Sequence, residues 1–377
     1  MERKILLNNK LRKPVLALGG DLKGSCAIAL GREVSIDDGF GDLADLDNFL
    51  KYRKAVEKKR RSLGLSRHTI VCDLHPGYVS SRYAEELCAE RRDWCSLLKV
   101  QHHESHLASC LTEHGITGRT IGVAFDGTGY GRDGNVWGGE FFVFDGRTFR
   151  RVGRLEYLPM PGSDAAIREP WRMAASYLYR AFGKDFLKLR IDFVRRVIDP
   201  KKWNVVRQMI DKKIHSPLTS SAGRFFDAVS SLVLLKHTVA HEAEAAIALE
   251  RIAQDAADQT YRFRLTKSGD CTVVDTGPVI KGVVRDMLKN RGAPYIAAKF
   301  HATIIEIIAA ACGRIRRAYH IDKVLLSGGV FQNDIVLKGV KAALSGDGFR
   351  VYHHVKVPTS DSGLPLGQIA LAALTGR

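Results

Sequence analysis

The sequence predicts an α/β protein of two similar lobes, and two observations carry this prediction. Strands and helices alternate in the N-terminal third of the chain and again near its C-terminus, which is typical of α/β folds. In addition, residues 14–30 and 120–144 share one pattern, an apolar strand, a Gly-rich polar turn and a second apolar strand. We therefore expect residues 1–119 to form a first lobe. Residues 120–377 form a second, with a helical insertion and a C-terminal α/β segment.

The first lobe is predicted from this alternation. After the hairpin, the segment "LADLDNFLKYRKAVEKKRR" is expected to form a helix. That helix would turn Leu46, Phe49, Leu50 and Val56 towards one face and gather its cations at the C-terminal end, where the helix dipole favours them. A strand is expected in "HTIVCDLH", a helix in "SSRYAEELCAE", a short strand in "SLLKV", and a helix at the histidines that follow.

The second lobe begins with the other hairpin and is then mainly helical. Apolar residues recur with helical spacing over residues 168–183, 222–237, 241–257 and 297–319. The chain then returns to strand, helix, strand and helix over residues 323–374. Two facing ribonuclease-H-like lobes, each opening with a phosphate-binding hairpin, describe the fold shared by actin, hexokinase and the heat-shock chaperone ATPases. A cleft between such lobes would hold a nucleotide.

Bulk composition narrows the classes of function. The seven cysteines are spread out without a C-x-x-C pair, which indicates reduced thiols and a cytoplasmic protein. No membrane partner is expected, because the most apolar segment, "ATIIEIIAAACG", is short and contains Glu306. The formal net charge of +17 is compatible with a nucleic acid, a nucleotide or an acidic protein as partner. Nucleic acid is not expected, since the chain has no zinc finger and no aromatic–basic stripe.

Two histidines stand out in "VQHHESHLASCLTEHG". On a helix, His102 and His106 would lie on one face, one turn apart, and could bind one metal ion. Imidazole suits Zn and Fe, and an oxygen ligand from elsewhere would complete an open site. Asp361, in "VPTSDSGLPLGQ", is a candidate for that ligand. The alternatives are ordinary histidines at a helix N-terminus and, for Asp361, a helix cap.

Three Gly-rich turns follow predicted strands: "GGDLKG", "DGTGYG" and "LSGGVFQN". Exposed backbone N–H groups in such turns bind phosphate or carboxyl oxygens, although a single Gly turn is usually only a turn. Together they predict a nucleotide cleft, with Lys23 either meeting a phosphate or developing oxyanion or remaining an exposed turn residue. The candidate nucleotide contacts in these turns are Gly19, Gly20, Asp126, Gly127, Thr128, Gly129, Gly328 and Gly329. Four other polar residues are interpreted as structural: Asp73, His75, Glu242 and His301.

Taken together, these segments resemble the motifs of one family in the same order. "VLALGGDLKG", "CDLHPGYVSSRYAEE", "VQHHESH", "AFDGTGYGRDGNVWGGEFF", "LSGGVFQN" and "DSGLPLGQ" are similar to HypF, the carbamoyltransferase family that begins cyanide-ligand synthesis in [NiFe]-hydrogenase maturation. The resemblance runs from Pro14 to Leu374 and covers the C-terminal, TsaD-like part of that family. We therefore expect a standalone form without acylphosphatase, zinc-finger and YrdC-like domains. One departure is "HHESH", where the family usually has "HHHAH".

The resemblance implies a site and a reaction. His102, His106 and Asp361 would bind a divalent metal, Fe or Zn, and residues 125–129 would contact the nucleotide. Asn333 would lie on the adenosine side and Arg172 near the ribose. The substrate would be carbamoyl-adenylate from a separate YrdC-like adenylating protein, and the acceptor the C-terminal cysteine of HypE. Two alternatives stay open: an O-carbamoyltransferase acting on a small-molecule hydroxyl, and a non-catalytic nucleotide-binding assembly partner.

Overall fold

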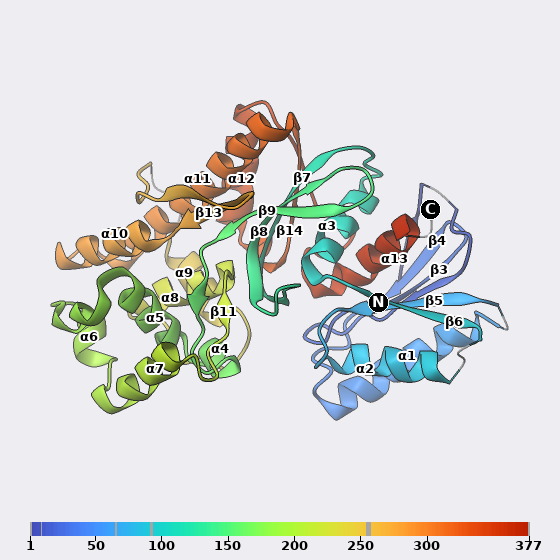
Figure 1. The fold of residues 1–377 in the computed structure, drawn as a ribbon, viewed down its shortest axis with the longest axis horizontal. Coiled ribbons are helices and arrows are strands. Elements are labelled where there is room, and N and C mark those ends of the chain that lie inside the picture. Colours follow the sequence, from blue (N-terminus) through green and yellow to red (C-terminus); the bar gives the residue numbers. More distant parts are fainter. Residues whose placement is uncertain (1, 9, 65, 91–92, 254–257, 376–377) are drawn as a thin grey trace.

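A computed structural model describes residues 2–8, 10–64, 66–90, 93–253 and 258–375. Two mixed β-sheets organise them (Figure 1). The first sheet has the strand order β1-β4-β3-β2-β5-β6, and the second has the main path β12-β13-β9-β8-β7-β14-β15. Their bounds are β1 Glu2–Leu6, β2 Val15–Ala17, β3 Cys26–Leu30, β4 Glu33–Asp37, β5 His68–Asp73, β6 Cys95–Val100, β7 Thr120–Tyr130, β8 Val136–Phe144, β9 Phe149–Leu155, β12 Arg264–Ser268, β13 Cys271–Asp275, β14 Lys323–Ser327 and β15 Arg350–His353. The short β11 Leu218–Thr219 pairs with β8, and the short β10 Leu158–Pro159 pairs with β11.

The two sheets contain the same five-stranded unit. In the first, β4, β3 and β2 are antiparallel neighbours, and β5 and β6 then continue parallel to β2. In the second, β9, β8 and β7 are antiparallel, and β14 and β15 continue parallel to β7. The predicted duplication is therefore real, and it extends beyond the two hairpins. The boundary near residue 120 stays a prediction.

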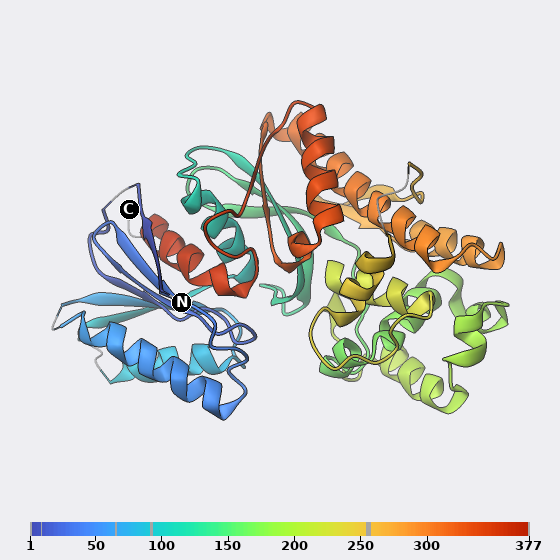
Figure 2. The ribbon, with the colours of Figure 1, turned by 180° about the vertical axis from the view of Figure 1, so that it is seen from behind.

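Helices cover these sheets in layers (Figures 1 and 2). Their bounds are α1 Leu46–Arg61, α2 Val79–Ala89, α3 His102–Glu113, α4 Asp164–Arg168, α5 Pro170–Phe182, α6 Asp192–Arg196, α7 Pro200–Lys212, α8 Ala222–Leu232, α9 Glu244–Ala253, α10 Gly277–Leu288, α11 Ala293–Tyr319, α12 Asp334–Gly346 and α13 Leu364–Thr375. One face of the first sheet forms a core with α1 and α2. Its other face forms a second core with α3, α13 and residues of the second sheet, so α3 and α13 lie between the sheets.

Apolar packing holds α13 against α3. Leu366 and Ile369 of α13 are fully buried in the same core as Leu107 of α3. The closest approach is at Gly367, where an added Cβ would lie 1.8 Å from the carbonyl oxygen of Ser105. This contact needs glycine because any side chain would displace one helix. The packing brings a C-terminal segment against the first sheet.

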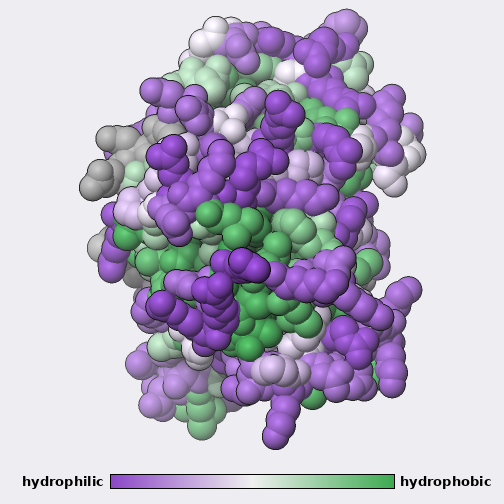
Figure 3. Space-filling model, turned by 90° about the vertical axis from the view of Figure 1, so that its left-hand side faces the viewer, coloured by the Kyte–Doolittle hydropathy of each residue, from purple (hydrophilic) through white to green (hydrophobic). Residues whose placement is uncertain are grey.

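The helical insertion is largely as predicted, with α5, α8, α9 and α11 at the expected places; residues 254–257 lie outside the described residues. Helix α11 has the length and apolar character of a membrane span, yet 67% of its apolar window is buried inside the molecule. Its buried side chains, among them Phe300 and Ile304, belong to the core that the second sheet forms with the helical insertion. Figure 3 views the outer end of this helical part, where hydrophobic side chains gather at the centre of a hydrophilic face.

Two sequence expectations about elements were wrong. Strands β9, β12 and β13 were missed in the part of the chain expected to be mainly helical; β9, for example, has three Arg among its seven residues and lacks a clear apolar alternation. In α1, Val56 is buried and Phe49 packs on the core as expected, whereas Leu46 and Leu50 are 69% and 42% exposed and Tyr52 and Lys59 are buried in their place. Lys59 can be buried because its ammonium group lies 3.2 Å from the carboxylate of Asp37.

Candidate functional site

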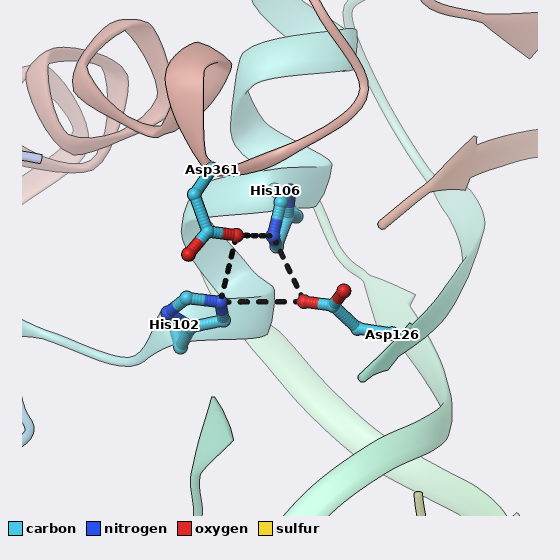
Figure 4. A group of neighbouring side chains, drawn as sticks. All are labelled: His102, His106, Asp126 and Asp361. Carbon is cyan, nitrogen blue, oxygen red and sulfur yellow. Dashed lines mark ion pairs between the residues drawn. The ribbon is translucent and has the colours of Figure 1, made fainter. Parts of the chain in front are cut away.

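Helix α3 presents its two histidines at its N-terminus. The Gln101 side chain caps the helix by accepting a hydrogen bond from the Glu104 N–H at 2.9 Å. His102 and His106 are both buried, and their rings lie 4.9 Å apart between centroids. The i, i+4 spacing thus places both Nε2 atoms on one side of the helix, as the sequence predicted (Figure 4).

Two carboxylates from other parts of the fold meet these imidazoles (Figure 4). Asp126 Oδ2 lies 3.3 Å from Nε2 of His102 and 3.2 Å from Nε2 of His106. Asp361 Oδ1, just before α13, lies 3.6 and 3.4 Å from the same two atoms. The structure therefore brings His102, His106 and Asp361 together as expected, and it adds Asp126. We call these four residues the cluster.

The cluster has the chemistry of a metal site. Nε2 of His102, Nε2 of His106 and Oδ2 of Asp126 are buried and make no hydrogen bond within the described structure. Leaving such atoms unsatisfied costs about 1–3 kcal/mol each. All four candidate ligand atoms lie within 4.8 Å of one another, as atoms around one ion would. Two imidazoles and two carboxylates suit zinc and iron.

Burial and charge shape the protonation of the cluster. Burial opposes the imidazolium form of His102, but the carboxylates of Asp361 and Asp73 outweigh it and hold its pKa well above the usual range. Burial likewise opposes ionisation of Asp126, but His102 and His106 hold its pKa well below the usual range. Protons on the imidazoles thus balance the carboxylates when no ion does, and a bound metal would displace them.

Asp73 positions His102 from behind. Its Oδ2 lies 2.7 Å from Nδ1 of His102, which fixes the ring so that Nε2 faces the cluster. We interpreted Asp73 as structural from the sequence, whereas it contacts a candidate ligand directly. The register of the sheet explains the contact: β5 and β6 are parallel, and Asp73 pairs with Val100, two residues before His102, which the sequence alone did not indicate.

A cavity of about 510 Å³ opens beside the cluster, and we call it cavity A. Asp126 and Asp361 line it together with Lys23 and with residues of α8, α9 and the turn after β14. Its volume lies within the range of small-molecule sites. Oδ1 of Asp126 accepts hydrogen bonds from the N–H groups of Gly127 at 2.8 Å and Gly329 at 2.9 Å. The Asp126 carboxylate thus belongs to the cluster and also binds the backbone of two Gly-rich turns.

The remaining predicted residues divide into four groups: those that line cavity A, those that line a neighbouring cavity, glycines that shape the backbone, and Arg172. Gly127, Gly329 and Asn333 line cavity A, and Asn333 also caps α12 by accepting from the Val336 N–H. Thr128 and Gly129 line a neighbouring cavity instead.

Other glycines shape the backbone. Gly328 has a φ of +103°, and an added Cβ would lie 2.3 Å from the carbonyl oxygen of Phe125. Gly19 donates its N–H to Gln368 of α13 at 2.8 Å, and a Cβ on Gly20 would lie 3.5 Å from Oδ2 of Asp361. These three glycines therefore allow close approach of the chain around the cluster rather than lining cavity A.

Arg172 is not brought to the site. Its guanidinium pairs with Glu169 and lies near the Trp171 ring, 5.3 Å from the centroid, and it lines neither of the two cavities. A different arginine lies beside the two cavities. Arg224 of α8 lines both cavities and pairs with the buried Asp227 at 2.6 Å. Sequence spacing gave no reason to prefer Arg224.

Comparisons with known proteins identify the family of this chain. Residues 10–113 match the model of the HypF Kae1-like domain, and residues 122–368 match that of the second subdomain of the carbamoyltransferase Kae1-like domain. The chain is 33% identical to carbamoyltransferase HypF2 of Cupriavidus necator over 95% of its own length and 46% of that relative. It is 34% identical to a carbamoyltransferase HypF homolog of the same organism, over 96% of this chain and 91% of that one.

Comparison with solved structures identifies the same family. A crystal structure of full-length HypF in its phosphate- and nucleotide-bound form matches with a TM-score of 0.91 and 35% identity, over 98% of this chain and 57% of that chain. HypF of T. kodakarensis matches with a TM-score of 0.86 and 27% identity, over 99% of this chain and 49% of that chain. The chain spans about half the length of most of these relatives, and the predicted two-lobed α/β fold is confirmed. It belongs to the HypF family and corresponds to the Kae1-like domains of that family.

Proposed function

We propose that this chain transfers a carbamoyl group from carbamoyl-adenylate to the C-terminal cysteine thiol of a HypE-like protein. The observation that carries the proposal is the cluster at the wall of cavity A, which joins a candidate metal site to a cavity of nucleotide size. Membership of the HypF family supplies the reaction class. A separate YrdC-like adenylating protein would supply the substrate.

Four residues would hold the metal: His102, His106, Asp126 and Asp361. Their unsatisfied buried atoms fit a divalent cation, iron or zinc, which would supply Lewis-acid chemistry when bound. The remaining groups act by binding and orientation. The Lys23 ammonium, which lines cavity A, would hold a phosphate oxygen, since the N–H groups of Gly127 and Gly329 are already donated to Asp126. Asn333 also lines cavity A and would contact the adenosine.

Support for nucleotide binding comes from the related HypF structure with phosphate and nucleotide bound. In cavity A, the Phe226 side chain and the apolar residues of α9 offer surface for a base, while Asp126 holds the turns in place. The adenylate would then direct its acyl end towards the cluster. In this arrangement the AMP leaving group would lie in cavity A and the carbamoyl group at the cluster.

The chemical step needs no nucleophile from this chain. The acceptor sulfur would bond to the carbamoyl carbon, the bond from that carbon to the phosphate oxygen would break, and AMP would leave with the electron pair. The thiol proton would pass to water. Burial raises the pKa of Cys26 and Cys72 to about 12, so neither offers a thiolate at neutral pH.

Carbamoyl labelling tests the proposal. The protein is mixed with carbamoyl phosphate, ATP, a YrdC-like adenylating protein and HypE, and the HypE C-terminal peptide is measured by mass spectrometry. We expect a carbamoyl adduct on its cysteine, abolished by His102→Ala. His114→Ala is the matched control, because His114 is an exposed histidine at the other end of α3 and lines neither cavity.

Two results would contradict the proposal. Labelling of a small-molecule hydroxyl with none on HypE would indicate an O-carbamoyltransferase. Binding of HypE with no labelling of any acceptor, and with an affinity unchanged in His102→Ala, would indicate a non-catalytic assembly partner.

A further inference from the structure

Asn333 lines cavity A with its side-chain amide held in one orientation. Its Oδ1 accepts a hydrogen bond from the Val336 N–H at 3.0 Å, and its Nδ2 lies 3.0 Å from Nε2 of the buried His301. A backbone N–H can only donate, so the amide oxygen must face Val336 and the amide NH2 group must face His301. The cap of α12 therefore decides which way the amide points.

The His301 ring is fixed from its other side. Its Nδ1 lies 2.8 Å from the carbonyl oxygen of Ala297, one turn earlier in α11. Because a carbonyl oxygen only accepts, Nδ1 carries the proton, and Nε2 of the neutral ring accepts from Asn333. Burial lowers the pKa of His301 to about 4, which keeps the ring neutral at neutral pH. Backbone groups at both ends thus determine the direction of every hydrogen bond in this chain.

One donor of Asn333 remains for cavity A. Nδ2 carries two hydrogens and His301 accepts one of them, while Oδ1 is turned towards the start of α12. The Phe226 ring, which also lines cavity A, meets the His301 ring edge-on at 5.3 Å between centroids. Asn333 and Phe226 therefore both contact His301, and they place an N–H donor beside an aromatic surface at one part of the cavity wall.

We propose that His301 is a positioning residue that makes Asn333 a hydrogen-bond donor to a ring nitrogen of the adenine base. This inference rests on the proposed function, since it takes cavity A as the site of the adenylate, and it adds the chemistry by which the base is recognised. The Nε2 acceptor of His301 keeps the amide oxygen away from the cavity. A ring nitrogen, which accepts, fits the remaining N–H, whereas the exocyclic amino group, which donates, does not.

Binding of AMP analogues tests the inference without turnover. In three analogues a C–H group replaces N1, N3 or N7 of adenine, and affinities are measured by calorimetry. We expect one of them to bind wild-type protein about tenfold more weakly than AMP, because it leaves the Asn333 donor unsatisfied. That difference should disappear in Asn333→Ser, which keeps a capping oxygen and removes Nδ2. Equal affinity for AMP and all three analogues overturns the inference, as does a difference that persists in Asn333→Ser.

Variants of His301 test its positioning role. His301→Phe keeps a ring beside Phe226 and removes the acceptor, so the amide of Asn333 can turn and the preference for AMP over that analogue should be lost. His301→Gln, which can place an oxygen near the position of Nε2, should retain the preference, and the exposed His114→Phe is the matched control. A role in stability alone would weaken all the nucleotides equally. An unchanged ratio of affinities in His301→Phe therefore overturns the inference.

A second measurement needs no variant. Nitrogen-15 NMR of histidine-labelled protein should show His301 as the neutral tautomer with its proton on Nδ1 at neutral pH. A proton on Nε2 overturns the inference even if His301→Phe does not fold. The two proposals also fail differently. Protein that shows the expected binding pattern but labels no acceptor overturns the proposed function alone, whereas carbamoyl transfer without an Asn333-dependent preference for AMP overturns this inference alone.

Discussion

Gly367→Ala has two opposing effects on stability: it improves helix propensity and it introduces a clash with α3. Gly367 lies inside α13, where alanine has the better helix propensity by about 1 kcal/mol. However, the new Cβ would lie 1.8 Å from the Ser105 carbonyl oxygen of α3, which is 1.6 Å short of the 3.4 Å where ordinary contact begins. The obstacle is backbone and cannot rotate away. Overpacking of this kind costs about 1–3 kcal/mol, so we expect a net loss of stability.

The new Cβ should also push α13 away from α3, and this movement should change the cluster. Asp361 immediately precedes α13, and His102 and His106 belong to α3, so moving the two helices apart changes the distances between ligands. Metal sites tolerate errors of only about 0.2 Å in ligand distance. A shift of even part of the required 1.6 Å should therefore weaken metal binding at least tenfold, or about 1.4 kcal/mol.

The assay compares two glycines inside helices. Gly313 lies within α11, and a Cβ added there would meet only the Arg317 guanidinium at 3.9 Å, so Gly313→Ala should gain up to about 1 kcal/mol. The free energy of unfolding is measured by urea denaturation of chelator-treated protein, and Zn²⁺ affinity by chelator competition. Equal stability of the two variants, with unchanged Zn²⁺ affinity in Gly367→Ala, would refute the packing argument.

Three further predictions follow from single contacts. Asp73→Asn should weaken Zn²⁺ binding about 10–100-fold, measured by chelator competition, because it removes the carboxylate that orients His102. Burial opposes ionisation of Glu113, but the His354 ring and backbone N–H groups lower its pKa to about 2, so its stabilisation is present above pH 4.5 and is lost as the pH falls towards 2. Glu113→Gln should flatten the fall in unfolding free energy over that range, and an unchanged profile would exclude this role. Phe300→Ala should cost about 3–5 kcal/mol in urea denaturation, because the ring is fully buried.

The sequence alone determined the elements and part of the site. Hydrophobic periodicity and Gly-rich turns are local properties, so they predicted the duplicated hairpins, the helix of His102 and His106, and the orientation of that pair on one face. Strands without a clear apolar alternation, such as the Arg-rich β9, were missed because their pairing partners stabilise them.

Only the tertiary structure decided which carboxylates complete the site. Asp126 arrives from an irregular part of β7, Asp361 through the packing of α13 on α3, and Asp73 through the register of β5 with β6. Arg172, which the family resemblance placed near the ribose, is held elsewhere by Glu169. These distances depend on strand order and on one close helix contact at Gly367, which are long-range properties that no local pattern of residues encodes.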